Sequence, residues 1–99
     1  MEKKVVKHNL MLKLKKPSTE ILERVRRHLL SMNGSVPGIK SLVVQADIRP
    51  NPTSHHLLMT ATFDSIEAFE SYLTHPAHLE VGLSVKPHIE SAASLLSSD

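Results

Sequence analysis

Three side chains in this sequence have the chemistry of an acid–base site: His8, Tyr72 and His78. An imidazole with a pKa near ~6.5 can take up a proton and return it at cellular pH. A phenol hydroxyl or an imidazole N–H can donate a hydrogen bond to an oxygen on which negative charge develops. Together these groups suit an enolisation or an aldol condensation, with His78 as the base and Tyr72 or His8 as the donor.

The same residues also admit a purely structural interpretation. A buried histidine is commonly satisfied by a backbone carbonyl, and a buried tyrosine is commonly a core residue whose hydroxyl has a partner. His75 precedes Pro76, where a helix must break or restart, so we expect His75 to fix that break. The residues alone leave open whether His8, Tyr72 and His78 line a ligand pocket, catalyse a reaction or only pack.

Metal binding is the other chemistry that histidines suggest. His75 and His78 are three residues apart, and His55 and His56 are adjacent. Adjacent strand residues point to opposite faces, so the second pair cannot easily share one ion. No acidic residue lies at a helpful offset from the first pair, and the chain has no cysteine. Because a glycine-rich phosphate loop is missing too, we predict no metal and no cofactor.

Length and composition narrow the class of protein. The chain of 99 residues suits a single domain, 1–99, with a core over about residues 5–97. Its net charge is only +2, and its lysines cluster near the N-terminus without interleaved aromatics, which predicts no nucleic-acid partner. No apolar run approaches the ~18 residues of a membrane span, and the first residues lack a signal-peptide pattern. With no cysteine to form disulfides, we expect a cytoplasmic protein.

Alternating apolar residues predict the strands. The stretch 5–15 alternates clearly and places His8 on the same face as its leucines. The stretch 39–48 is rich in β-branched residues, and 55–63 is nearly continuously apolar, which predicts burial on both faces. Alanine and serine favour strands poorly, so we assign a fourth strand to 91–97 on topology rather than propensity.

Helical spacing predicts the intervening segments. A first helix begins at a Ser18 or Thr19 cap and closes at the Asn33-Gly34 pair. A second begins at Asp64 or Ser65, with its apolar stripe formed by Ile66, Phe69 and Leu73 and with Tyr72 on its flank. Pro76 ends that helix and opens a short third one over 76–85.

The resulting order βαββαβ predicts an α+β, ferredoxin-like protomer with a four-stranded antiparallel sheet and both main helices on one face. The other face carries Met11, Val43 and Leu58 and needs a cover. A second copy packed sheet to sheet would supply it. We therefore predict a homodimer through the sheet face, with the two sheets forming a dimeric α+β barrel.

Three segments resemble the stress-responsive dimeric α/β-barrel (Dabb) family: VKHNLMLKLK from Val6, VPGIKSLVV from Val36 and YLTHPAH from Tyr72. The resemblance implies the same fold, with ferredoxin-like protomers around a central barrel. Some plant members close linear polyketides by aldol condensation. The resemblance to that branch implies functional roles at His8 and His78, with Tyr72 assisting.

This sequence departs from the plant cyclases in its pocket. Their first helix contributes bulky aromatics, whereas this chain has Val25, Arg26 and Leu29 at about those places, and it has no aromatic residue after Tyr72. We expect the pocket between sheet and helices to be lined by Leu10, Val25, Leu29 and Leu73.

Two hypotheses of function follow. The first is a small dimeric stress-responsive barrel protein that binds a small organic ligand between sheet and helices. The second is an enzyme of the cyclase or isomerase type, with His8, Tyr72 and His78 as catalytic residues.

Overall fold

Residues 5–98 form four strands and three helices, with a short 3-10 turn before the last strand. The computed structural model describes residues 5–98. Its elements in order are β1 (Val6–Leu14), α1 (Thr19–Leu30), β2 (Ile39–Ala46), β3 (Leu57–Phe63), α2 (Ile66–Leu73), α3 (Pro76–Val85), the 3-10 turn η1 (Lys86–His88) and β4 (Ile89–Ser98).

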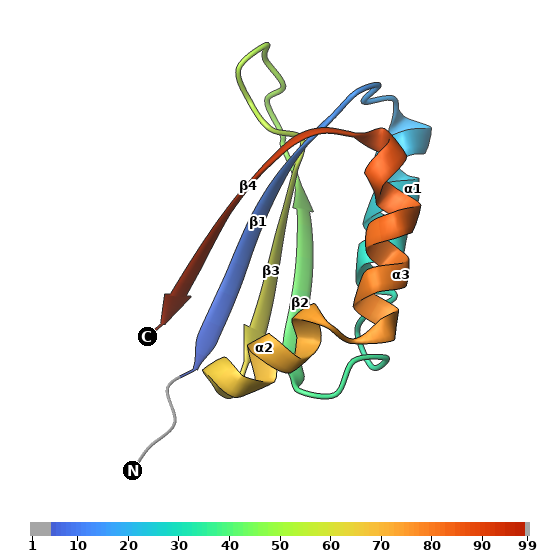
Figure 1. Ribbon diagram of the computed structural model, residues 1–99. Helices are drawn as coiled ribbons and strands as arrows, with labels where there is room; N and C mark the ends of the chain where they lie inside the picture. The colour runs from blue at the N-terminus through green and yellow to red at the C-terminus, as the bar shows by residue number, and fades with distance from the viewer. Residues whose placement is uncertain (1–4, 99) are drawn as a thin grey trace.

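The strands make one antiparallel sheet in the order β2-β3-β1-β4. The first strand is central, because it pairs with β3 on one side and with β4 on the other. The helices lie on one side of the sheet, with α1 and α3 side by side and α2 across one end (Figure 1). This arrangement confirms the predicted ferredoxin-like protomer, including the strand assigned at its C-terminus.

Side-chain caps set where the helices begin. The Ser18 hydroxyl accepts from the Ile21 amide at 3.2 Å, and α1 starts at the next residue. The Ser65 hydroxyl accepts from the Ala68 amide at 3.1 Å at the start of α2. The first helix ends at Leu30, earlier than its apolar spacing predicts, and the segment beyond it continues as turns.

Gly38 allows α2 to approach the turn before β2. Its φ of +97° lies in the left-handed region, and a Cβ there would stand 3.3 Å from the Cβ of Ala68. Another residue at this position would be strained and would push against α2.

The core lies between the sheet and the helices. It includes Leu12, Val25, Leu29, Met59 and Phe63, all buried. In β3 the burial alternates, with fully buried residues toward the helices and half-buried residues on the other face. The prediction that β3 is buried on both faces is therefore wrong for the protomer, because no helix covers its second face.

The buried side of α2 also differs from the prediction. Tyr72, placed on the flank by the sequence, is only 1% exposed, whereas Ile66 and Leu73 are both more than 40% exposed. The helix lies across the end of the sheet, so the side that carries Phe69 and Tyr72 faces the core. The expected stripe of Ile66, Phe69 and Leu73 is wrong in two of its three members.

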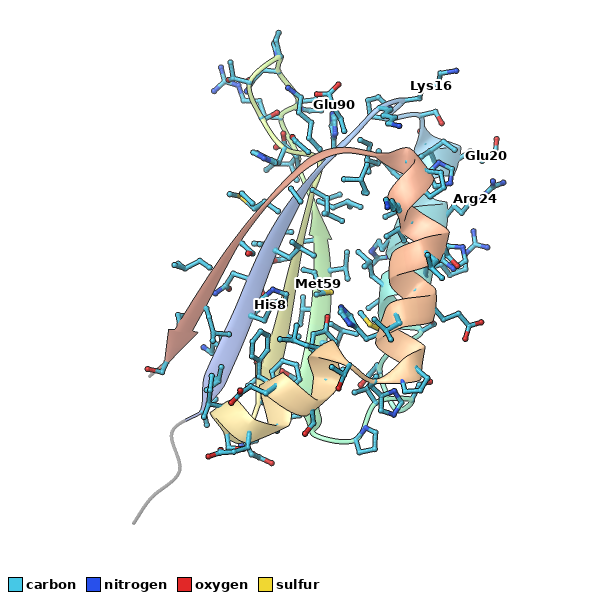
Figure 2. All side chains as sticks on the ribbon, in the orientation of Figure 1. His8, Lys16, Glu20, Arg24, Met59 and Glu90 are labelled. Carbon is cyan, nitrogen blue, oxygen red and sulfur yellow. The ribbon has the colours of Figure 1, made fainter. Side chains whose placement is uncertain are left out.

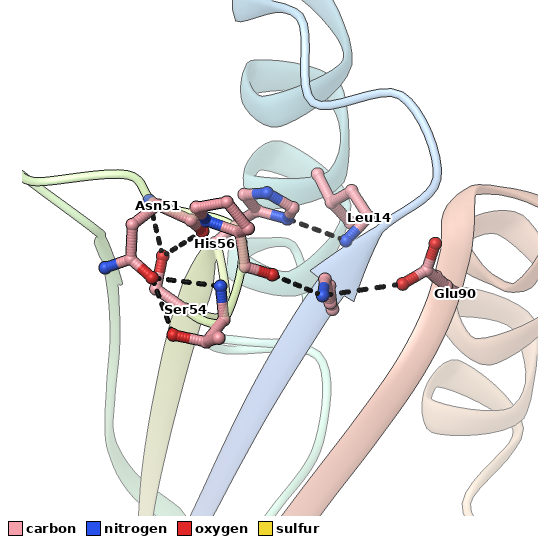
Figure 3. Close-up of polar contacts among 8 residues, drawn as sticks. Leu14, Asn51, Ser54, His56 and Glu90 are labelled. Carbon is pink, nitrogen blue, oxygen red and sulfur yellow. Dashed lines mark hydrogen bonds and ion pairs between the residues drawn. The ribbon is translucent and has the colours of Figure 1, made fainter.

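The connection between β2 and β3 is an ordered loop that contacts β1 (Figure 3). The Lys13 ammonium donates to the Pro52 carbonyl at 3.0 Å and lies 3.7 Å from the Glu90 carboxylate. The Leu14 amide donates to Nδ1 of His56 at 2.8 Å. His56 is thus a structural residue that joins this loop to the end of β1.

Among residues 5–98, no helix is both long enough and apolar enough to cross a membrane.

Candidate functional site

His8 lies on β1, on the side that faces the helices (Figure 2). Its neighbours across the sheet are Ala61 on β3 and Leu96 on β4. Its ring centroid is 5.2 Å from that of Phe69 and 6.2 Å from that of Tyr72. Within residues 5–98, its Nδ1 is one of the buried side-chain atoms with no hydrogen-bond partner. A buried polar atom without a partner is costly, so this nitrogen has unused capacity for a ligand.

Tyr72 connects the two histidines. Its ring is 6.2 Å from His8 and 4.2 Å from His78, centroid to centroid. Phe63 and Phe69 complete the aromatic surroundings at 5.1 Å and 6.0 Å. Burial raises the pKa of Tyr72 to about 12, so its hydroxyl keeps its proton throughout the physiological range and remains a hydrogen-bond donor.

His78 lies in the first turn of α3, and its Nδ1 is 3.1 Å from the carbonyl oxygen of Leu73 at the end of α2. A carbonyl oxygen can only accept, so this contact requires the proton on Nδ1. In the neutral ring Nε2 then carries the lone pair and can act as a base. The helix break at Pro76 creates this arrangement, because it brings the start of α3 back to the end of α2.

His75 has a different role. Its Nδ1 accepts from the Ala77 amide at 3.1 Å and so caps α3. The two histidines therefore make different contacts. His75 caps the start of α3, and His78 contacts the last residue of α2. No group of three or more metal-ligating side chains that could hold an ion occurs within the described part of the chain.

The electrostatics of the site keep His8 neutral. Burial is the main cause that lowers the pKa of His8, and the nearby imidazole of His78 lowers it further. A neutral His8 donates from one ring nitrogen and accepts at the other. The site thus combines a phenol donor with two imidazoles, one of which, His78, has its tautomer fixed by the backbone.

A cavity of about 80 Å³ lies between sheet and helices beside this cluster. A water molecule occupies roughly 30 Å³ in the liquid, so the cavity has space for a small organic group. Its lining includes Leu10, Leu29, Met59, Tyr72, His78 and Val81.

Two of the four residues expected to line the pocket are found at this cavity, Leu10 and Leu29. The other two lie elsewhere: Val25 is fully buried in the core, and Leu73 is exposed at the end of α2. Arg26 is held by the sheet, since its Nε donates to the Val44 carbonyl at 3.3 Å.

Several residues of the site are not predicted from the sequence. Phe69 contacts His8, Met59 faces the cavity from β3, and Val81 and Val85 face it from α3. A signal for the last two existed in the four-residue spacing of their valines, which marks the inner side of α3. The Met59 position follows from the alternation of β3, which places it on the same side as its buried neighbours.

Fold and site together define a class: an α+β ferredoxin-like protein with an aromatic and imidazole cluster between its sheet and its helices. The model of the stress responsive A/B barrel domain (Dabb) matches residues 6–96. The chain belongs to this family, as the resemblance of its three segments predicts.

Solved structures with the same fold include two dimeric proteins of bacteria. A dimeric ferredoxin-like protein of unknown function from Thermobifida fusca is 16% identical, with a TM-score of 0.85 over 100% of this chain and 94% of that one. A dimeric protein of unknown function from Bacteroides fragilis is 20% identical, with a TM-score of 0.82 over 96% of each chain.

The third relative is an enzyme of a plant. Hydroxynitrile lyase from Passiflora edulis is 18% identical, with a TM-score of 0.83 over 96% of this chain and 93% of that one. At these identities the likeness establishes the fold alone. A comparison with curated proteins gives no match.

Proposed function

We propose that this protein is a homodimer that binds a small organic ligand between sheet and helices, at His8, Tyr72 and His78. The observation that carries the proposal is the unpartnered, buried Nδ1 of His8 next to the ring of Tyr72, in a region with a cavity lined by Tyr72 and His78. Hydrophobic surroundings with a few convergent polar groups are typical of small-molecule sites.

The open face of the sheet supports the dimer. Met11, Val43 and Leu95 are all exposed there, on three different strands. An apolar surface of this kind on a small domain is typical of an interface. Its occupant is a second copy packed through the sheet face, in agreement with the dimeric relatives from Thermobifida fusca and Bacteroides fragilis.

A second function, acid–base catalysis of the cyclase or isomerase type, is favoured by the tautomer of His78. In this reaction Nε2 of His78 takes a proton from the carbon next to a carbonyl, and the electron pair moves to the carbonyl oxygen. Tyr72 or His8 donates a hydrogen bond to that oxygen, and the proton returns to carbon or a new carbon–carbon bond forms. The hydroxynitrile lyase of Passiflora edulis supports the idea that this fold can carry catalysis.

Ligand binding is tested with acetone and 2-butanone, which are small enough for the cavity. Nuclear magnetic resonance of the histidine and tyrosine rings reports contact directly, and the single tyrosine gives an unambiguous signal. We expect the resonances of His8, Tyr72 and His78 to shift together, while those of His28 on α1 stay unchanged. If none of these three resonances shifts at a saturating concentration of ketone, the proposed site is refuted.

Catalysis is tested in deuterium oxide with the same ketones. An enolising protein exchanges the hydrogens next to the carbonyl for deuterium, whatever its natural substrate. We expect His78→Ala and Tyr72→Phe to slow this exchange by 10-fold or more, a modest part of the ~10²–10⁴-fold typical of general acid–base catalysis. His28→Ala is the matched control. Exchange equal to that in buffer would assign the site to binding without catalysis.

A further inference from the structure

Within residues 5–98, no helix covers β4 on the face of the sheet that carries the helices, whereas helices cover the other strands on this face. Ala92, Ser94 and Leu96 follow one another on this side, and all are exposed. They stand beside the middle of β1, where Ser94 pairs with Leu10 and Leu96 pairs with His8. The helices pack mainly against β2 and β3, and β4 lies at the edge of the sheet, away from α1 and α3 (Figure 1).

A groove of about 420 Å³ lies at the C-terminal end of β4, on this uncovered side. Its apolar walls come from Val6 at the start of β1, Leu96 on β4 and Ile66 in the first turn of α2. Ser65 and Glu67 form part of its rim. Ile66 and Leu96, 42% and 39% exposed, are the large apolar side chains that the groove leaves open to solvent.

His8 stands between this groove and the inner cavity. Val6, two residues before it, lines the groove, and Leu10, two residues after it, lines the cavity. All three point to the same side of β1, and strand geometry separates alternate residues by about 7 Å. The His8 side chain therefore lies between the two spaces, with the Phe69 ring packed against it at 5.2 Å, centroid to centroid.

We infer that the groove is the outer compartment of the ligand site. It binds the apolar tail of an elongated, uncharged molecule, whose polar head lies at His8, Tyr72 and His78, and the His8 side chain forms the boundary between head and tail. The inference rests on the proposed function, because it extends that binding site outward. It adds Val6, Ile66 and Leu96 as the residues that determine the length of the ligand.

The uncharged, amphiphilic class follows from the surroundings. The head meets a neutral imidazole and a protonated phenol, neither of which offers a charge to pair with. The tail meets three apolar side chains, and each methylene that they bury strengthens binding by up to about fourfold. The affinity of the ligand should therefore rise with the length of its alkyl tail once that tail extends beyond His8.

The probes are unbranched 2-alkanones from acetone to 2-nonanone, titrated into the intact protein while the ring resonances of His8 and Tyr72 are recorded. We expect the dissociation constant to fall by about two- to fourfold per methylene beyond 2-pentanone. Leu96→Trp fills the groove and should abolish this gain, while acetone still shifts both rings. Ile66→Trp narrows the groove from the opposite wall and should act in the same direction.

Leu83→Trp is the matched control, because it adds the same side chain at an exposed position on the outside of α3. It should leave the dependence on chain length unchanged. If acetone shifts the rings but Leu96→Trp and Ile66→Trp leave the chain-length dependence at its wild-type value, or no dependence exists, the outer compartment is refuted and the inner site stands. If no alkanone shifts the rings, both the outer compartment and the proposed site are refuted.

Discussion

The imidazole of His78 packs against the phenol ring of Tyr72, with their centroids 4.2 Å apart. The contact joins α3 to α2 across the break at Pro76, and it places an imidazole and a phenol side by side. Tyr72 is at the same time the most completely enclosed aromatic of α2. Its ring therefore belongs to the core, and substitutions can remove its ring or its hydroxyl separately.

We predict that Tyr72→Ala lowers the free energy of unfolding by about 3–5 kcal/mol, because it empties a buried aromatic position. Tyr72→Phe keeps the ring and should change stability by about 1 kcal/mol or less. Urea denaturation followed by circular dichroism measures both. A Tyr72→Phe variant as unstable as Tyr72→Ala would show that the hydroxyl, rather than the ring, holds α2 in place.

The single tyrosine allows its ionisation to be followed by absorbance near 295 nm. Burial raises the pKa of Tyr72 to about 12, whereas an unfolded tyrosine ionises near ~10. The folded state is thus favoured below pH ~10, and this contribution is lost as the pH rises toward 12. We expect ionisation in native protein to lag behind that in urea. Coincident curves would contradict the buried position of the phenol.

Acid should weaken the fold through His8. The pKa of His8 in the folded protein is lowered, mainly by burial and further by His78. The unfolded chain therefore binds a proton at this residue at a higher pH than the folded chain does. This contribution to stability is complete above pH ~6.5 and is lost as the pH falls through the lower folded pKa. We expect His8→Gln to reduce the loss of stability between pH 7.5 and 5, measured by urea denaturation. His28→Gln serves as the control and should keep the wild-type dependence.

The dimer should separate when charge is placed on the open face of the sheet. Met11→Asp and Val43→Asp add carboxylates where a second copy would bury them, at a cost far above that of an exposed charge. Sedimentation velocity at micromolar concentration should give a dimer for the wild type and a monomer for either variant. Leu83→Asp, on the outside of α3, should remain dimeric. Dimers in all three variants would place the interface elsewhere.

We predict that His75 caps α3 and takes no part in the ligand site. His75→Ala removes the acceptor for the Ala77 amide and should lower stability by about 1 kcal/mol. His75→Asn restores a good capping acceptor and should recover most of that loss. Neither change should alter the response of the His8 or Tyr72 resonances to acetone, and a lost response in His75→Asn would give this histidine a role in the site.

The sequence predicted the fold better than the details of the site. Periodicity located β1 and its half-buried histidine, and topology alone identified β4 despite its alanines and serines. The prediction for the inner side of α2 is wrong, because the angle at which the helix crosses the sheet buries Tyr72 rather than Leu73 and depends on distant residues. The contact of His78 with the Leu73 carbonyl depends on the geometry of the break at Pro76, and spacing in the sequence does not encode that geometry.

The central place of β1 has a consequence for how the chain folds. Val6 pairs with Phe63 on one side and with Ser98 on the other, so the first strand finds both partners far along the chain. Pairings of such long range slow folding relative to helical bundles, whose contacts are mostly local. During synthesis β1, which lies between β3 and β4 in the sheet, emerges before both of its partners. Its second edge stays unpaired until β4 (Ile89–Ser98) has been synthesised and has left the ribosome.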